Sequence, residues 1–256
     1  MPTPTNHHRA RTLASLGAYI ERARSFSGWS FADVDTRYLD PPAPWDYEAL
    51  AHHHAQRARS IVDLGTGGGE VLARIISGID GRIVATEEWH VNAPIAAARL
   101  GPLGAQVVRA DSLRLPFANE TFDLVLDRHE ALTPADAARV IAPGGTIITQ
   151  QCGPNDWPEL GRFVEKVRFP DHFVSYQQGF ADAGLTVIDA RLHERRIAFA
   201  TLGDLVYMML VAPWSFPKFD PAADIDALLS IEGELATPDG IAVTEVRYLI
   251  IAHKPN

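Results

Sequence analysis

Short apolar runs alternate with segments of helical periodicity between residues 60 and 150. Val71, Leu72, Ile75 and Ile76 recur at the spacing of one helix face. Five apolar runs predict strands: SIVDL (60–64), RIVATE (82–87), AQVVRA (105–110), FDLVLD (122–127) and TIITQ (146–150). Strands that alternate with helices are joined by crossovers, so the pattern predicts a mostly parallel, doubly wound α/β sheet with helices on both faces.

Capping residues mark the helices between these strands. Asn92 and Pro94 can begin a helix that Gly101 ends, and Thr133 and Pro134 supply an N-cap and a proline at the first helical position. These signals support the alternation that the apolar runs indicate.

The regular alternation of strands and helices ends after residue 150. A helix is expected over 172–184, a long strand over 185–196 and a last strand near the C-terminus, over 244–254. An insertion at 197–240 separates these two strands, with one helix over 201–210 and a second from Pro221. An insertion of that length is typical of a lid or a substrate-facing cap. Residues 1–46 are expected to form a helix and a Pro-rich loop.

Composition narrows the class of protein. The chain has 256 residues, 46% hydrophobic and 21% charged, which suits one sizeable soluble core. The net charge is −9 and no Lys/Arg run occurs, so a nucleic-acid partner is disfavoured. The N-terminus lacks the apolar core of a signal peptide, and no apolar stretch reaches the ~20 residues of a membrane span, so we expect a cytoplasmic protein without membrane attachment.

A glycine-rich turn, VDLGTGGGE, follows the first strand. Gly65, Gly67 and Gly69 would let a ligand approach the backbone at a helix N-terminus. A dinucleotide fingerprint requires a third glycine three positions after Gly67, but Glu70 stands there and would repel a pyrophosphate. S-adenosylmethionine (SAM) has no phosphate and carries positive groups, so acids near the turn, such as Asp63 and Glu70, favour it.

Acidic residues also end the next two strands. Glu87 ends the second strand, where a carboxylate can accept hydrogen bonds from ribose hydroxyls. Asp111, with Ser112 beside it, follows the third strand and can accept from an adenine amino group. Carboxyl ends of parallel strands are where such folds bind ligands. The cluster Asp127–Glu130 lies at the same edge.

These motifs resemble class I SAM-dependent methyltransferases. VDLGTGGGE, VATEE, RADSLRLPFANETFDLVLD and RVIAPGGTIITQ occur in the order of that family's motifs over about residues 45–195. PWDY, GTGGGE, ATE, RHE and TQQ further resemble a bacterial subgroup with a type-11-like domain. Asp127 stands where that subgroup is expected to have asparagine, and Cys152 where valine is commoner.

The resemblance implies a Rossmann-like fold with a seven-stranded sheet whose last strand is antiparallel. It implies SAM as cofactor and S-adenosylhomocysteine as product. The expected organisation is an N-terminal helical segment (1–46), a SAM-binding core (47–196), a helical lid insertion (197–240) and a final core strand (241–256). The residues expected to bind the cofactor are Asp63, Gly65, Gly67, Gly69, Glu87, Asp111, Ser112, Asp127 through its backbone, and Arg128 near the methionine end.

His129 and Glu130 are the candidates for catalysis. Either can serve the acceptor as a base or an orienting group, or the pair can tie the strand end to the lid by hydrogen bonds. No metal site is expected, because His52, His53 and His54 are consecutive on a helix and point about 100° apart.

Aromatic and amide side chains are expected to line the acceptor pocket, namely Trp45, Gln150, Tyr207 and Trp214, with Trp29 and Phe216 nearby. They favour transfer of methyl to a small, ring-bearing metabolite. An RNA or protein methyltransferase, a SAM-binding protein without methyl transfer, and a nicotinamide-dependent oxidoreductase remain alternatives. The sequence does not identify the acceptor, the methylated atom or the oligomeric state.

Overall fold

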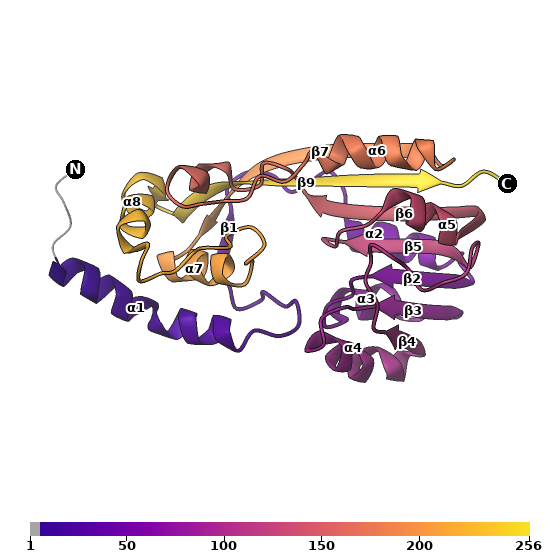
Figure 1. The fold of residues 1–256 in the computed structure, drawn as a ribbon, viewed down its shortest axis with the longest axis horizontal. Helices are drawn as coiled ribbons and strands as arrows, with labels where there is room; N and C mark the ends of the chain where they lie inside the picture. The colour runs from indigo at the N-terminus through magenta and orange to yellow at the C-terminus, as the bar shows by residue number, and fades with distance from the viewer. Residues whose placement is uncertain (1–5) are drawn as a thin grey trace.

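The computed structural model describes residues 6–256 and arranges them around one sheet of nine strands (Figure 1). The sheet order is β1-β7-β9-β6-β5-β2-β3-β4, with β8 paired to β9. The strands are β1 (Thr36–Tyr38), β2 (Ser60–Leu64), β3 (Arg82–Thr86), β4 (Ala105–Val108), β5 (Phe122–Arg128), β6 (Ile141–Cys152), β7 (Thr186–Phe199), β8 (Ala236–Thr237) and β9 (Gly240–His253). Residues 1–5 of the N-terminal segment lie outside the described part.

Eight α-helices and two short 3₁₀ helices accompany the sheet in the described residues. They are α1 (Asn6–Arg24), α2 (Tyr47–Ala55), α3 (Glu70–Ile75), α4 (Asn92–Leu100), η1 (Gly101–Leu103), α5 (Pro134–Val140), η2 (Pro158–Arg162), α6 (His172–Asp182), α7 (Leu202–Leu210) and α8 (Ile225–Leu235). The helices that begin at Asn92 and Pro134 confirm the predicted starts, although neither of these two helices has a side-chain capping hydrogen bond at its N-terminus.

The predicted doubly wound sheet is confirmed. Strands β2 to β6 pair in parallel, and β9 pairs antiparallel with both β6 and β7. The seven expected strands are β2 to β7 and β9. The two additional strands are short, and β1 has only three residues, so neither carries an apolar run that a sequence pattern could detect.

Three elements differ from the expected bounds. The strand predicted at 146–150 runs from Ile141 to Cys152. Ile141 pairs with Phe122 and Thr146 with Leu124, so the PGG segment bulges between these pairs, with Gly144 at a φ of 75°. The insertion is shorter than 197–240, since β7 continues to Phe199 and β9 begins at Gly240. Its second helix begins at Ile225 rather than Pro221.

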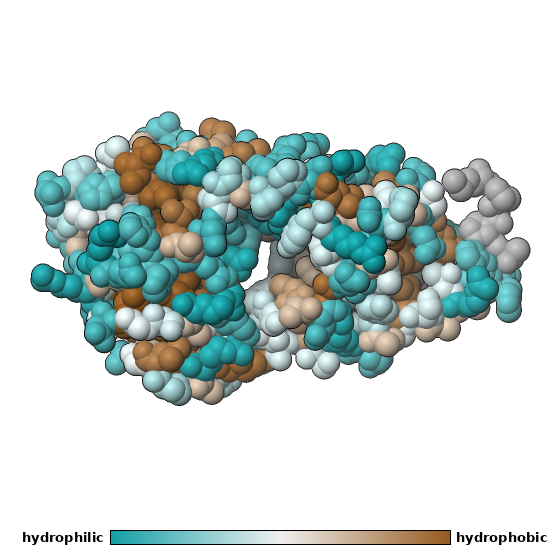
Figure 2. Space-filling model, turned by 180° about the vertical axis from the view of Figure 1, so that it is seen from behind, coloured by the Kyte–Doolittle hydropathy of each residue, from teal (hydrophilic) through white to brown (hydrophobic). Residues whose placement is uncertain are grey.

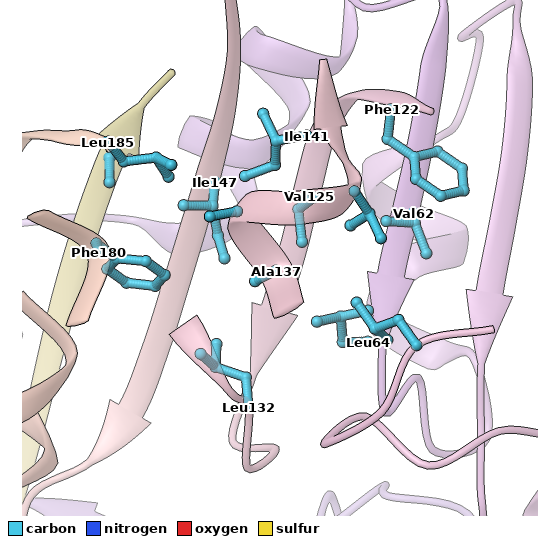
Figure 3. Packing of buried hydrophobic residues seen from close by; sticks show 14 of the residues in the cluster. Val62, Leu64, Phe122, Val125, Leu132, Ala137, Ile141, Ile147, Phe180 and Leu185 are labelled. Atoms are coloured by element: carbon cyan, nitrogen blue, oxygen red, sulfur yellow. The ribbon is translucent and has the colours of Figure 1, made fainter. Parts of the chain in front are cut away.

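Each face of the sheet buries an apolar cluster. On one face, Val125 and Ile147 pack with Ala137 of α5 and Phe180 of α6 (Figure 3). On the other, Leu126 and residues of α2, α3 and α4 form a second cluster. Because side chains alternate along a strand, each acidic side chain at a strand end points toward one face of the sheet or the other.

The molecule has two lobes joined by two long strands (Figure 1). Strands β7 and β9 have 14 residues each, but β9 pairs with β6 only from Arg247 onward. Their far ends pack with α1, α7 and α8 around a third apolar cluster that includes Phe199 and Ile241. We call this part the cap lobe and the remainder the core lobe. Figure 2 shows an opening between the lobes, with hydrophilic residues along much of its rim.

Candidate cofactor and acceptor site

The carboxyl ends of neighbouring parallel strands bring the predicted acids to one edge of the core lobe. Asp63 lies in β2, Asp127 in β5, and Glu87 follows β3 directly. The glycine turn between β2 and α3 lies among them. Gly65, Gly67 and Gly69 have φ values of 59°, 62° and 79°, a region that favours glycine.

Glu87 is fixed to this turn by backbone hydrogen bonds. Its Oε2 accepts from the Gly67 N–H at 2.7 Å, and its Oε1 accepts from the Trp89 N–H at 2.8 Å. Each oxygen keeps a second lone pair, so the carboxylate is held in place and can still accept from a ligand. The residue is buried, and burial raises its pKa above the ordinary value.

Asp63 and Asp127 are buried acids with few compensating partners. Burial raises the pKa of Asp63 to about 7, with Glu87 adding repulsion and Arg128 opposing the rise. Burial also raises the pKa of Asp127, although its Oδ2 accepts from the Thr149 hydroxyl and the Gln151 amide, both at 2.6 Å. The other Asp127 oxygen has no hydrogen-bond partner in residues 6–256.

Glu130 and Trp29 lie over the glycine turn. A Cβ added at Gly65 would overlap the Glu130 side chain, and one added at Gly67 would overlap the Trp29 indole. Burial and the charges of Glu87, Glu88 and Asp111 raise the pKa of Glu130 to about 7. Glu130 therefore stands on the cofactor side of the edge, beside the glycine turn.

The remaining predicted cofactor residues lie at the same edge. The Asp111 carboxylate accepts from the Leu113 N–H at 2.8 Å, and Ser112 is buried. Arg128 is exposed at the end of β5 and makes no ion pair with any residue in 6–256. Its charge reaches both Asp63 and His129, because it opposes the raised pKa of the first and lowers that of the second.

This arrangement fits a cationic cofactor. An unpartnered Asp127 oxygen, a fixed Glu87 carboxylate and a glycine turn open to close approach are what the sulfonium, ammonium and ribose groups of SAM need. A pyrophosphate at this helix N-terminus is disfavoured, because the Glu70 carboxylate begins α3 there. Glu70 also forms an ion pair with Arg99 at 2.7 Å.

His129 adopts an unusual backbone conformation beside β6. Its φ is 64°, which only a few per cent of non-glycine residues adopt and which is often found at functional sites. Its ring nitrogens lie 3.4 Å from Gln150 Nε2 and 3.5 Å from Cys152 Sγ. Gln150 Oε1 in turn accepts from the Trp45 indole N–H at 2.7 Å. The sequence-predicted residues Trp45, Gln150 and His129 are thus brought together.

The aromatic residues of the cap lobe differ in their contacts and in their exposure. The Arg22 guanidinium lies 3.8 Å from the centre of the Tyr207 ring, and Trp214 contacts Trp29 edge to face at 5.7 Å. Trp214 is about half exposed, whereas Phe216 is buried in the cap-lobe cluster. Only Trp214 therefore connects the cap directly to the indole above the glycine turn.

Three residues at the site were missed by sequence reasoning. Tyr47 is buried with its hydroxyl unpartnered in the described chain, and the charges of Asp63 and Asp127 add to the burial that raises its pKa. Trp89 stacks on Phe26, and Asn92 accepts a hydrogen bond from the Gly28 N–H at 2.7 Å. The sequence signals available for two of them were the PWDY motif, which contains Tyr47, and the position of Trp89 two residues after Glu87.

Replacing Glu87 with alanine is expected to weaken SAM binding about 10- to 100-fold. A hydrogen bond to a charged group contributes about 1.5–3 kcal/mol, and the carboxylate also holds the Gly67 amide in place. Titration calorimetry on the folded variant measures the change. Asp80→Ala, an exposed acid before the opposite end of β3, serves as the control, and an unchanged affinity in Glu87→Ala would remove Glu87 from the site.

Two further findings concern other kinds of site. Within residues 6–256, no group of three or more His, Cys, Asp or Glu side chains is arranged to hold a metal ion. His52 instead contacts the Ile75 carbonyl through Nδ1 at 2.7 Å. In the same part of the chain, no helix has both the length and the apolar content needed to cross a membrane.

Comparison with known proteins agrees with this geometry. Residues 61–145 match a family model described as a methyltransferase domain. A search of curated proteins finds no match. With 15% identity and a TM-score of 0.57, a structure from Bacillus halodurans C-125, described as a candidate methyltransferase, aligns over 82% of this chain and 99% of its own.

Two further solved structures are similar over nearly the whole chain. A functionally unknown protein from Deinococcus radiodurans R1 is 17% identical with a TM-score of 0.61, covering 96% of this chain and 98% of its own. The 4+2 cyclase SpnF is 15% identical with a TM-score of 0.55, covering 99% and 97%. Residues 61–145 therefore match a methyltransferase domain, a family that implies SAM as cofactor, and the chain has the Rossmann-like class I fold.

Proposed function

We propose that this protein transfers the methyl group of SAM to a small, ring-bearing molecule that binds in the opening between the lobes. The observation that carries the proposal is a cluster of mutually repelling acids around the glycine turn. We call it the acidic cluster, and its members are Asp63, Glu87, Glu88, Asp111, Asp127 and Glu130.

Like charges held this close are unfavourable unless a cation joins them. The carboxyls of Asp63, Asp127 and Glu130 each have a raised pKa, partly because neighbouring acids repel their ionised forms. A ligand with two positive groups relieves that repulsion, whereas a phosphate-bearing nicotinamide cofactor would add to it. The acidic cluster therefore favours SAM over the oxidoreductase alternative.

The chain's own residues have separable roles in this proposal. Bound SAM supplies an electrophilic methyl group on a sulfonium. Glu87 and the glycine turn would hold the cofactor, while Trp29 would exclude water above Gly67. His129 would take the proton of the acceptor, because enclosure by protein and the charges of Arg247 and Arg128 lower its pKa and keep the imidazole neutral at pH 7.

A second candidate function is SAM binding without methyl transfer. SpnF has the same fold and is described as a cyclase, so the fold by itself does not decide between transfer and another reaction. The small-molecule acceptor is supported by the net charge of −9, which disfavours RNA, and by the opening between the lobes.

SAM titration at several pH values tests the proposal. Asp63 and Glu130 have pKa values of about 7, so they lose their protons as the pH rises from 6 to 8 and then attract the cationic cofactor. We expect SAM affinity to rise over this range and NADH to show no comparable binding. Release of S-adenosylhomocysteine on adding hydroxylated aromatic compounds would establish transfer. SAM binding with no release from any acceptor would favour the second candidate, and preferential NADH binding would contradict both.

A further inference from the structure

Beyond His129, the sheet carries basic side chains on the same face on which Ile197 and Val243 join the cap-lobe cluster. Cys152 pairs across the strands with Arg247, and Arg247 pairs with His193. Arg195 and Glu245 form the next pair on the same face, because side chains alternate along each strand. These positions lie where β7 and β9 pass from the core lobe to the cap lobe.

Part of this positive charge is neutralised within the protein. Arg247 donates to Asp156 Oδ1 and to Glu245 Oε1, both at 2.8 Å, and Arg195 donates to the other Glu245 oxygen at 2.6 Å. All four side chains are largely buried, so the network fixes their positions.

Two further cations at this place form no direct ion pair in residues 6–256, although Asp156 attracts Lys166 electrostatically. Arg128 is exposed at the end of β5, and Lys166 is half-buried in the segment after η2. The Cys152 thiol is within electrostatic range of both, as it is of Arg247. We define the basic cluster as Arg128, Lys166, Arg195 and Arg247. Against Asp156 and Glu245, these four cations leave an excess of two positive charges.

The basic cluster contrasts with its surroundings. The protein is acidic overall, with a net charge of −9, and the acidic cluster lies on the other side of His129. SAM itself carries one carboxylate, on the methionine end that Arg128 is expected to meet, so one of the two excess positive charges is left for another ligand. A cleft wall of one sign concentrates ligands of the opposite sign and stabilises them when they are partly desolvated.

We propose that the methyl acceptor carries a carboxylate, and that Lys166 and Arg247 bind this group beside His129, with Arg128 between it and the cofactor. This inference rests on the proposed function, because it specifies the acceptor of the same site. A single carboxylate matches the small charge excess, whereas the ring of the acceptor has aromatic neighbours in Trp45, which contacts His193 edge to face at 6.2 Å, and Tyr38, whose ring lies 4.1 Å from the Arg195 guanidinium.

Matched acid and amide probes test the charge requirement. The probes are para-hydroxyphenylacetate and para-hydroxyphenylacetamide, which share the ring and the hydroxyl and differ in charge. Their affinities for the protein saturated with S-adenosylhomocysteine are measured by ligand-observed NMR. We expect the acid to bind about 10- to 100-fold more tightly, as for a hydrogen-bonded charge pair. Equal affinities, or no binding of either probe, would overturn the inference.

A pair of variants at Cys152 assigns the preference to the basic cluster. Cys152 is exposed, so Cys152→Asp and Cys152→Asn should both fold, and they differ only in charge. We expect Cys152→Asp to remove the preference for the acid and Cys152→Asn to keep it. Retention of the preference in Cys152→Asp would refute the placement. SAM calorimetry separates this inference from the proposed function. If SAM binds but acids are not preferred, only the inference about the acceptor fails. If SAM does not bind, the proposed function is refuted as well.

Discussion

Replacing Asp63 with asparagine is expected to stabilise the unliganded protein at pH 8 and to weaken SAM binding at the same time. Asp63 is only 7% exposed, and burial raises its pKa from 3.8 to about 7. A carboxyl whose pKa is higher in the folded state destabilises that state once it ionises. The cost is absent below pH 4, grows as the pH rises to 7 and is complete above pH 7.

The size of this effect follows from the pKa difference. A shift of about three units at ~1.4 kcal/mol per unit gives an upper value of about 4 kcal/mol, and Asp63→Asn should recover on the order of 2–4 kcal/mol at pH 8. Urea unfolding at pH 4 and pH 8 measures it, with no gain expected at pH 4. Asp80→Asn, at an exposed position, is the control. A loss of stability at pH 8 would show that the ionised Asp63 is compensated within the unliganded protein.

The second large effect is expected at His129. His129→Ala should lower turnover by about 100- to 10,000-fold, the usual contribution of a positioned base, while SAM binding persists. Its protonation state can be worked out from its neighbours. The Trp45 indole can only donate, so it fixes Gln150 Oε1 as acceptor and directs the Gln150 amide N–H groups toward His129 Nε2. That nitrogen therefore accepts, which leaves the hydrogen on Nδ1, facing Cys152 Sγ. The Gln150 contact is long, at 3.4 Å, and the acceptor hydroxyl would have to replace it to give its proton to Nε2.

Gln150→Glu tests this assignment through pH dependence. A carboxylate at this position accepts rather than donates, so it stabilises the imidazolium and raises the pKa of His129. We expect the rise of turnover with pH to move upward by about one unit or more, and NMR titration of the His129 ring to move with it. Trp45→Phe, which removes the indole N–H together with part of the ring, should give a smaller shift. An unmoved profile in a folded Gln150→Glu variant that binds SAM would exclude His129 as the base.

The clustering of the expected cofactor residues at one edge of the sheet was largely predictable from local sequence. Asp63, Glu87 and Asp111 lie at or just beyond the ends of successive apolar runs, and parallel topology alone brings those ends to one edge. The position of Glu130 was less accessible. The sequence grouped it with His129 as a candidate for catalysis, yet its side chain lies over Gly65. The backbone at His129, just before it, takes a left-handed conformation that no sequence motif predicts.

The opening between the lobes required the three-dimensional structure. Trp29 reaches Gly67 from a loop nearly forty residues earlier in the chain, and Arg247 meets Asp156 across about ninety residues. Such contacts depend on where the long strands end and how the cap packs on them, which periodicity does not encode. The role of Trp45, Gln150, Tyr207 and Trp214 in acceptor binding stays a prediction.

The unbroken strands between the lobes have a mechanical consequence. The ladder of β7 and β9 runs from Thr186 opposite His253 to Phe199 opposite Ile241, with one register shift near Val187. Bending the lobes apart within the plane of the sheet would break backbone pairs, so we expect the two strands to resist that motion. We expect ligand exchange to depend on the loop after α1, which contacts the core lobe through the Gly28–Asn92 hydrogen bond and stacked rings. We therefore expect the loop after α1 to open and close the site, while the two long strands hold the lobes apart.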